Sequence, residues 1–140
     1  MDSSKKKPII IIGSGKHAKV LINILLSCNR KILGVTDPNK KIGESFAGLK
    51  VLGNDEIIFK YPNSDIELVN SVAELSLRNI AYKISEKFRS KGYIFSNVIH
   101  PSSIIEDKVE IGVGTQIMAG VIIQNSAKIG RSCIINTGVK

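Results

Sequence analysis

The amino-acid sequence predicts an α/β protein in which a small parallel sheet, covered by helices, precedes the start of a parallel β-helix. Up to about residue 98, short β-branched runs alternate with segments whose apolar residues have helical spacing. From Ile99 onward, isoleucine recurs at every sixth position instead. This change of period divides the chain into two domains, over residues 8–98 and 99–140, after a basic tail of residues 1–7.

The first domain has the order of elements expected for a parallel sheet. The run of four isoleucines at 9–12 ends in glycine, as a buried strand does, and a helix follows Gly15 with apolar positions Ala18, Leu21, Ile22 and Leu25. Further strands are expected at 32–36, which stops at an Asp-Pro turn, and at 66–69 and 93–99. A second helix is expected over 74–90, with one apolar face formed by Leu77, Ile80, Ala81, Ile84 and Phe88. Strands separated by helices pair in parallel through crossover connections.

The second domain repeats every six residues. Its isoleucines occupy positions 99, 105, 111, 117, 123, 129 and 135, and four residues after each comes a small or β-branched residue: Ser103, Val109, Thr115, Val121, Ala127, Cys133 and Val139. A period of six fits neither a helix nor a simple strand, but it is the signature of a hexapeptide β-helix. Three hexapeptides form one coil, so the chain holds about two coils and stops within the pattern. We therefore expect it to be an N-terminal portion or a naturally shortened protein.

Composition excludes several function classes. The net charge is +8, but the lysines are scattered outside the tail, and there is no tryptophan and only 5% aromatic content, so nucleic acid is not the expected partner. No apolar run is long enough for a membrane span or a signal peptide, which favours a cytoplasmic protein. Cys28 and Cys133 fit no metal-ligand spacing and are expected to be reduced packing residues.

The turn between the first strand and the first helix, Gly13-Ser14-Gly15-Lys16-His17-Ala18, fits G-x-G-x-x-A. Glycines permit close approach of a phosphate to the helix N-terminus, and Asp37, 22 residues after Gly15, is placed to accept ribose hydroxyls. The alternative is a tight turn with no ligand. A full dinucleotide-binding fold uses two mononucleotide-binding halves, and only about 95 residues precede the β-helix, which leaves no room for the second half. A nucleotide or nucleotide sugar is therefore favoured as the ligand over NAD, and a nicotinamide-dependent oxidoreductase is disfavoured.

Two histidines are present. His17, in the glycine turn, is a candidate for ligand contact, with local bonding at the helix start as the alternative. His100, where the two domains meet, is expected to be a structural junction residue. The sequence has no Ser-His-Asp set, metal cluster or P-loop lysine signature.

The segments "IIIIGSGKHAKVL", "GVTDPNKKIG", "VIHPSSII" and "IGRSCIINTG" together resemble the NeuD/PglD family of sugar O- and N-acetyltransferases of the sialic acid and bacillosamine pathways, over residues 8–140. The resemblance implies a Rossmann-like domain and a left-handed parallel β-helix that assembles as a homotrimer. It also implies acetyl transfer from acetyl-CoA to an amine or hydroxyl of a nucleotide sugar or an activated sugar acid.

Residue roles follow from the resemblance by position. They are nucleotide contact by Gly13, Ser14, Gly15 and His17, base or ribose contact by Asp37, a substrate contact by Asn70 and a place near the acceptor for Asn136. The general-base histidine of the family comes a few residues after the "NTG" segment, beyond Lys140. The resemblance therefore implies that this chain is inactive alone, and the alternative function is a non-catalytic nucleotide-sugar-binding or oligomerisation module.

Overall fold

The computed structural model of the chain describes residues 6–136. Most of the predicted tail and the last repeat position, Val139, lie outside this range. The chain forms two compact units that divide between Phe95 and Ser96. The expected boundary was three residues later, and it moves because Phe95 bridges to Leu68 in the first unit, whereas Val98 already pairs with Gln116 in the second.

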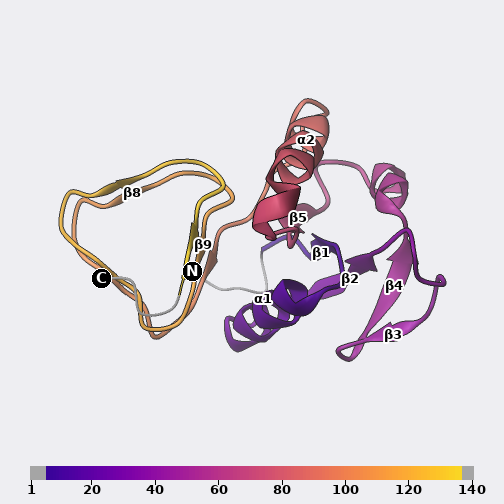
Figure 1. Cartoon of the computed structure of the whole chain (residues 1–140), viewed down its shortest axis with the longest axis horizontal. Helices are drawn as coiled ribbons and strands as arrows, with labels where there is room; N and C mark the ends of the chain where they lie inside the picture. The colour runs from indigo at the N-terminus through magenta and orange to yellow at the C-terminus, as the bar shows by residue number, and fades with distance from the viewer. Residues whose placement is uncertain (1–5, 137–140) are drawn as a thin grey trace. The chain divides into compact units, whose positions relative to one another are not determined.

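The first unit is built on a five-stranded sheet of order β3-β4-β2-β1-β5 (Figure 1). The strands are β1 (Ile9–Ile12), β2 (Ile32–Thr36), β3 (Ser45–Phe46), β4 (Leu49–Gly53) and β5 (Glu67–Asn70). Strands β4, β2, β1 and β5 are parallel, and β3 joins the edge as an antiparallel hairpin partner of β4. The predicted parallel sheet is confirmed, and the β3–β4 hairpin is an addition that the sequence did not reveal.

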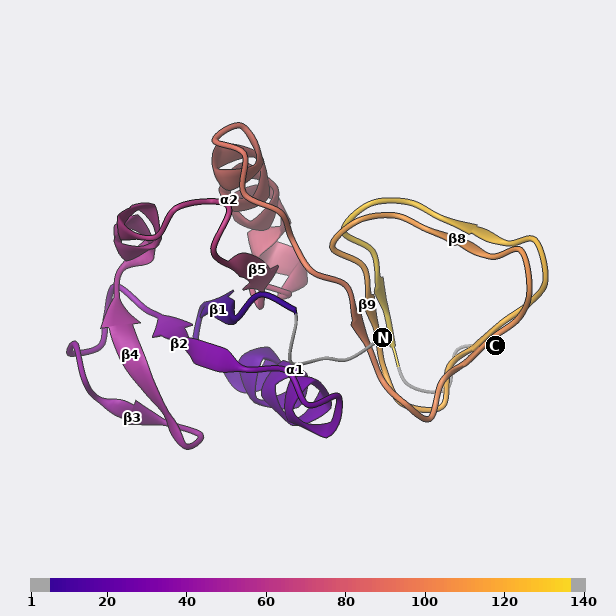
Figure 2. The same cartoon turned by 180° about the vertical axis from the view of Figure 1, so that it is seen from behind.

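Helices cover both faces of this sheet. Helix α1 (Lys16–Ser27) and helix α2 (Arg78–Arg89) lie on opposite sides of it in both views (Figures 1 and 2). The 3-10 helices η2 (Asp55–Lys60) and η3 (Leu75–Leu77) precede β5 and α2. Helix α1 ends where Asn29 takes a left-handed φ of 57° and the Arg30 amide bonds to the Leu25 carbonyl, which is the Schellman arrangement.

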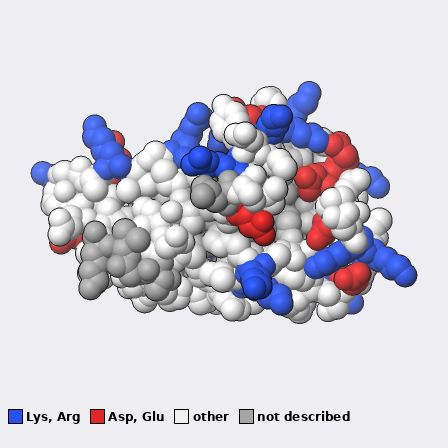
Figure 3. Space-filling view, in the orientation of Figure 1, with Lys and Arg blue, Asp and Glu red and all other residues white. Residues whose placement is uncertain are grey.

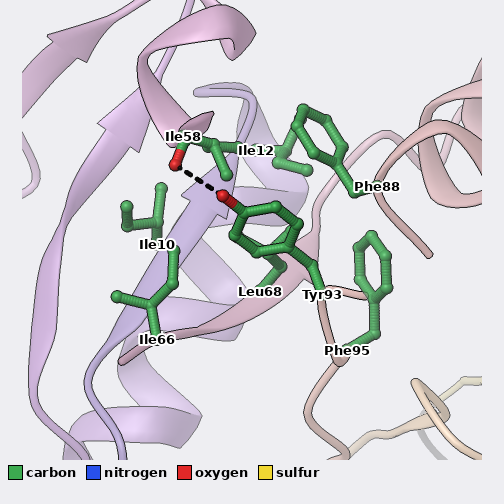
Figure 4. Packing of buried hydrophobic residues seen from close by; sticks show 8 residues of the cluster. All are labelled: Ile10, Ile12, Ile58, Ile66, Leu68, Phe88, Tyr93 and Phe95. Carbon is green, nitrogen blue, oxygen red and sulfur yellow. Dashed lines mark hydrogen bonds between the residues drawn. The ribbon is translucent and has the colours of Figure 1, made fainter. Parts of the chain in front are cut away.

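Successive side chains of β1 point to opposite faces of the sheet, and because all four are isoleucine, β1 contributes apolar side chains to both faces. Ile10 and Ile12 belong to a core cluster that also contains Ile58, Ile66, Leu68, Phe88, Tyr93 and Phe95 (Figure 4). Ile9 and Ile11 point to the opposite face, the side of α1, whose buried residues are Ala18, Leu21, Ile22, Ile24 and Leu25. The Tyr93 hydroxyl lies within this cluster and donates to the Ile58 carbonyl, so its polar end is satisfied.

Two expectations for the first unit are wrong in detail. The second helix begins at Arg78 rather than at 74. Ile80, which was expected on its apolar face, is 50% exposed, because the buried residues of the helix, Ser85 and Phe88, lie in its second half. The strand expected over 93–99 does not form as one element. Phe95 makes a single bridge to β5, and Val98–Ile99 is the first strand of the second unit, β6.

The second unit is a parallel β-helix, as predicted. Its two-residue strands are β6 (Val98–Ile99), β7 (Ile104–Ile105), β8 (Glu110–Ile111), β9 (Gln116–Ile117), β10 (Ile122–Ile123), β11 (Lys128–Ile129) and β12 (Ile134–Ile135). Each pairs with the strand eighteen positions away, giving the parallel sets β6-β9-β12, β7-β10 and β8-β11. The coil traces a triangle in Figure 1.

The repeating isoleucines fill the interior of the coil. Ile117, with a rung on each side, is fully buried, and Ile99 and Ile135, with a rung on one side, are partly buried in the same cluster. The turns repeat as well, because a left-handed φ recurs every six residues, at Lys108, Gly114, Gly120, Ser126 and Ser132. Only two of these positions carry the glycine that such a φ favours.

Basic and acidic side chains are mixed on one face of the molecule. On the face drawn in Figure 3, lysine and arginine side chains are interspersed with carboxylates. Among residues 6–136, no helix is both long and apolar enough to cross a membrane. Within the same range, neither Cys28 nor Cys133 takes part in a disulfide.

Candidate functional site

The candidate site lies at the carboxyl ends of three adjacent strands. Gly13 follows β1, Asp37 follows β2 and Ser71 follows β5, with β1 between the other two in the sheet. In open α/β sheets, ligands bind at this edge, beside the turn from the first strand into its helix. The structure thus brings the glycine turn and Asp37 together, as the sequence predicted.

The two glycines of the turn differ in whether the fold requires a glycine at their position. Gly13 has a left-handed φ of 96°, and a Cβ there would lie 2.6 Å from the Ser71 hydroxyl oxygen, which itself donates to the Ile12 carbonyl. Gly13 is therefore required by the fold. Gly15 has an ordinary extended φ of −101°, and a Cβ there would meet nothing within 4 Å. Gly15 therefore faces open space, which we call the cradle, and the fold does not require a glycine at this position.

The start of α1 is suited to an anion. Gly15 is the N-cap, no side chain caps the helix, and its first turn carries no acidic residue. A helix N-terminus presents backbone N–H groups and a partial positive charge, which together favour phosphate. With the cradle at Gly15 in front of it, this helix end fits the phosphate of a nucleotide.

Asp37 is fixed at the end of β2 by hydrogen bonds to both carboxylate oxygens. The Ser14 hydroxyl donates to Oδ2, and the Asn39 amide donates to Oδ1 at 2.8 Å. Burial raises the pKa of Asp37, but these two hydrogen bonds and the Lys40 ammonium outweigh it and hold the pKa below its usual value. Each carboxylate oxygen retains a further acceptor position, so the ionised group can still accept from ribose hydroxyls.

Ser14 connects the two loops. Its hydroxyl is committed to Asp37, and its carbonyl oxygen accepts from Lys40 Nζ at 3.2 Å. The side chain of Ser14 therefore positions Asp37, and Ser14 itself is 9% exposed. Lys40 was not singled out from the sequence, although the pair of lysines after the Asp-Pro turn was the available signal.

Asn70, the last residue of β5, has its side chain engaged within the fold. Its amide nitrogen donates to the Ala81 carbonyl and the Ser85 hydroxyl, and its Oδ1 accepts from the Val72 amide. These bonds tie the end of β5 to α2. Asn70 thereby positions this edge of the sheet, and its contact with a substrate stays a prediction.

Of the remaining candidates, His17 belongs to the first unit, and His100 and Asn136 belong to the second. His17 is half-buried at the second position of α1, next to the cradle. In the β-helix, His100 Nδ1 accepts from the Ser102 amide at 2.9 Å, while the Ser102 hydroxyl accepts from the Gly120 amide. Asn136, the last described residue, is exposed after β12. In the range 6–136, no group of three or more histidine, cysteine or acidic residues is arranged to hold a metal ion.

The fold and the candidate site together define a class of protein. In this class, a small α/β unit carries a glycine turn of the kind that binds nucleotides, and a parallel β-helix follows it in the chain. The family model of the PglD N-terminal domain matches residues 8–84. The chain belongs to this family of NeuD/PglD-type sugar acetyltransferases. A comparison with curated proteins found no match.

Solved structures agree with this family. A mutant of perosamine N-acetyltransferase from Caulobacter crescentus, in complex with CoA and GDP-perosamine, is 31% identical with a TM-score of 0.83, over 94% of this chain and 60% of that chain. PerB from the same bacterium, with the same ligands, gives 31% identity and a TM-score of 0.80 over the same shares. The acetyltransferase domain of PglB from Neisseria gonorrhoeae, with acetyl coenzyme A, is 20% identical, and its TM-score of 0.80 over 94% of this chain and 62% of that chain shows the shared fold alone. This chain thus spans about three fifths of the relatives it matches.

Proposed function

We propose that this chain is the acceptor-binding part of an acetyltransferase that moves an acetyl group from acetyl-CoA to an amino or hydroxyl group of a sugar. The sugar is linked to a nucleotide or is an acidic sugar, in surface-glycan biosynthesis. The observation that carries the proposal is the open cradle at Gly15, the N-cap of a helix without a side-chain cap, next to Ser14, whose hydroxyl donates to the ionised Asp37. Relatives of 31% identity were crystallised with CoA and GDP-perosamine, which supports the same ligand classes here.

In this proposal the first unit holds the nucleotide of the acceptor. The first amides of α1 receive a phosphate, Asp37 accepts from the ribose or base, and Ser14 keeps Asp37 in place. His17 lies at the margin of the cradle and is the histidine we propose to contact the ligand.

The acetyl transfer requires an attack of the acceptor nitrogen or oxygen on the thioester carbonyl. The new amide or ester bond forms as the C–S bond breaks, the acceptor proton goes to a general base, and CoA leaves as a thiolate that takes up this proton from the base to become the thiol. We expect the 140-residue polypeptide not to perform this step alone, since the family resemblance assigns the general base to neither His17 nor His100. Assembly as a homotrimer of left-handed β-helices, acetyl-CoA binding along them and a cytoplasmic location belong to the same proposal.

Isothermal titration of the purified chain tests the proposal. A GDP-linked amino sugar, a UDP-linked amino sugar, a CMP-linked sugar acid and NAD serve as ligands. We expect saturable binding of at least one sugar nucleotide, weakened by Asp37→Ala and lost in Gly15→Val, with no binding of NAD. A folded chain that binds NAD alone, or none of the four, would overturn the proposal.

A further inference from the structure

An exposed isoleucine lies near the end of β4, next to the candidate site. In the sheet β4 neighbours β2, and the Asp37 amide donates to the Gly53 carbonyl at the end of β4, at 2.8 Å. Ile42 contacts this glycine, since a Cβ built on Gly53 would lie 3.9 Å from Ile42 Cδ1. Among the described residues, Ile42 is nevertheless the most exposed of the large apolar side chains, at 78%. An apolar side chain is thus presented to solvent beside Asp37.

The loop that carries Ile42 is held against β4. The Gly43 amide donates to the Val51 carbonyl at 2.8 Å, and the Val51 amide donates to the Glu44 carbonyl at 2.9 Å. Ile57, a half-buried residue of η2, also lies against Gly53, with its Cβ 3.5 Å from the Cβ position built there. Ile42 is therefore fixed in place, and a flat ring that covered it would remove apolar area from water.

A carboxylate is fixed in the same region, at the first residue of η2. Asp55 Oδ1 accepts from the Thr36 hydroxyl at 2.8 Å, and Thr36 is fully buried at the end of β2. The Thr36 carbonyl in turn accepts from the Gly13 amide at 2.9 Å, which links Asp55 to the glycine turn. Among residues 6–136, no other hydrogen bond reaches the half-buried Asp55 carboxylate, so its Oδ2 is available to a ligand.

The order of the strands indicates which part of a nucleotide reaches this region. Along the edge of the sheet, Gly13 at the end of β1 is followed by Asp37 after β2 and then by Gly53 at the end of β4. A nucleotide with its phosphate at the start of α1 and its ribose at Asp37 extends in the same direction, so its base lies at the end of β4.

A carboxylate distinguishes the bases by their hydrogen-bonding edges. Guanine presents two adjacent donors, N1–H and the 2-amino group, and a carboxylate accepts from both. Uracil presents its N3–H between two carbonyl oxygens, which a carboxylate repels. Adenine and cytosine each present one amino group beside a ring nitrogen that is itself an acceptor. We propose that Asp55 accepts from the edge of the base while Ile42 covers its face, which makes this site select guanine as the carrier base of the sugar.

This inference rests on the proposed function and names the base of its substrate. GDP, IDP, ADP and UDP share ribose and phosphates, so their affinities in titration calorimetry isolate the base. We expect GDP to bind about tenfold more tightly than ADP or UDP, as charge-assisted hydrogen bonds would give. IDP lacks only the 2-amino group and should bind about threefold to tenfold more weakly than GDP. These comparisons need no variant.

Variants assign the selectivity to Asp55. Asp55→Asn keeps the size of the side chain and an acceptor for Thr36, but removes the charge and one acceptor oxygen. It should weaken GDP binding about tenfold and should not weaken the binding of ADP or UDP. Glu56→Gln is the matched control, because the same charge is removed at the next residue of η2, where the carboxylate accepts from Lys87, and it should change none of the affinities.

The apolar contact has its own pair of variants. Ile42→Ser should weaken GDP binding about threefold to tenfold, because the face of the base loses its cover. Leu26→Ser removes a side chain that is 52% exposed near the far end of α1, and should change no affinity. Thermal melting of each variant checks that it remains folded.

The possible failures are distinguishable. If the unaltered chain binds none of these four nucleotides and no sugar nucleotide, the proposed function is overturned and the inference falls with it. If it binds ADP or UDP as tightly as GDP, or binds only a CMP-linked sugar, the inference alone fails. An unchanged preference for GDP in Asp55→Asn contradicts the inference in the same way.

Discussion

Gly13 and Gly15 look alike in the sequence, but the structure predicts opposite consequences for their replacement. Gly15→Ser would place a hydroxyl in open space at the N-cap of α1, where serine is better than glycine by a few tenths of a kcal/mol. For a domain of this size, that corresponds to a melting temperature unchanged or raised by about 1–4 °C. The new hydroxyl would also occupy the amides that a phosphate needs, so nucleotide affinity should fall at least about tenfold.

Gly13→Ala is the matched opposite case. The left-handed φ of 96° costs an alanine about 1–2 kcal/mol. Its Cβ would displace the Ser71 hydroxyl from a 2.6 Å hydrogen bond to the Ile12 carbonyl, a loss of about 1 kcal/mol more. Together these lower the melting temperature by roughly 10 °C. Melting followed by circular dichroism, with titration calorimetry on the same samples, measures both effects. If the Gly15→Ser variant binds nucleotide as tightly as the unaltered chain, the claim that a phosphate binds at Gly15 is refuted, and the glycine turn is a turn without a ligand.

Three further predictions concern other parts of the chain. Gly112→Ala should destabilise the β-helix by at least about 2 kcal/mol, because a Cβ there would lie 2.5 Å from the backbone of the next coil. Gly130→Ala is the control, because a Cβ at Gly130 would meet only the Cys133 sulfur, at 3.8 Å, and equal losses of stability for the two variants in urea unfolding would contradict this. The pKa of Asp37 is lower in the folded chain than in the unfolded chain. Its ionised carboxylate therefore stabilises the fold at pH values above the unfolded pKa, and this stabilisation is lost as the pH falls through the folded pKa. Ser14→Ala should raise the pKa of Asp37 in an NMR titration, and the stability difference from the unaltered chain should shrink between about pH 6 and about pH 2; a difference independent of pH would disprove the link. Ala47→Asn should stabilise the β3–β4 hairpin by about 0.5–1 kcal/mol in thermal unfolding, since Ala47 has a φ of 48° in a two-residue turn that favours asparagine before glycine; a lower melting temperature would count against it.

The β-helix could be predicted from the sequence because its signal is strictly periodic. Each inward isoleucine is separated from the next by the same six residues, and eighteen residues close one coil, so pairings such as Ile104 with Ile122 follow directly. The first strand and helix were equally clear, since four β-branched residues, a glycine turn and a helical apolar pattern follow in order.

The errors arose where tertiary contacts override the local pattern. Tyr93 to Ile99 reads as one strand, but the chain changes units within it, so Phe95 and Val98 pair in different sheets. Ile80 has the spacing of a core residue and remains exposed because its end of α2 is not covered within the first unit. The β3–β4 hairpin was missed because an Ala-Gly turn is a weak hairpin signal.

The residues of the candidate site could be brought together from the sequence, but the structural role of each one could not. The spacing of the glycine turn and Asp37 placed both at one edge of the sheet. Which glycine serves the fold depends on the approach of Ser71, which is 58 residues away from Gly13 in the chain. The engagement of Asn70 with α2 depends likewise on packing that only the folded structure shows.

The central claim is that the glycine turn and the end of β2 form the nucleotide site of a sugar acetyltransferase. Amide chemical shifts of the isotope-labelled chain, followed while a GDP-linked amino sugar and its UDP-linked counterpart are added, test it most directly. The account predicts that at least one of them shifts the amides of Gly13, Ser14, Gly15 and His17, together with those of Asp37 and Lys40. Shifts confined to residues 96–136, or none with either ligand in a folded chain, would contradict it.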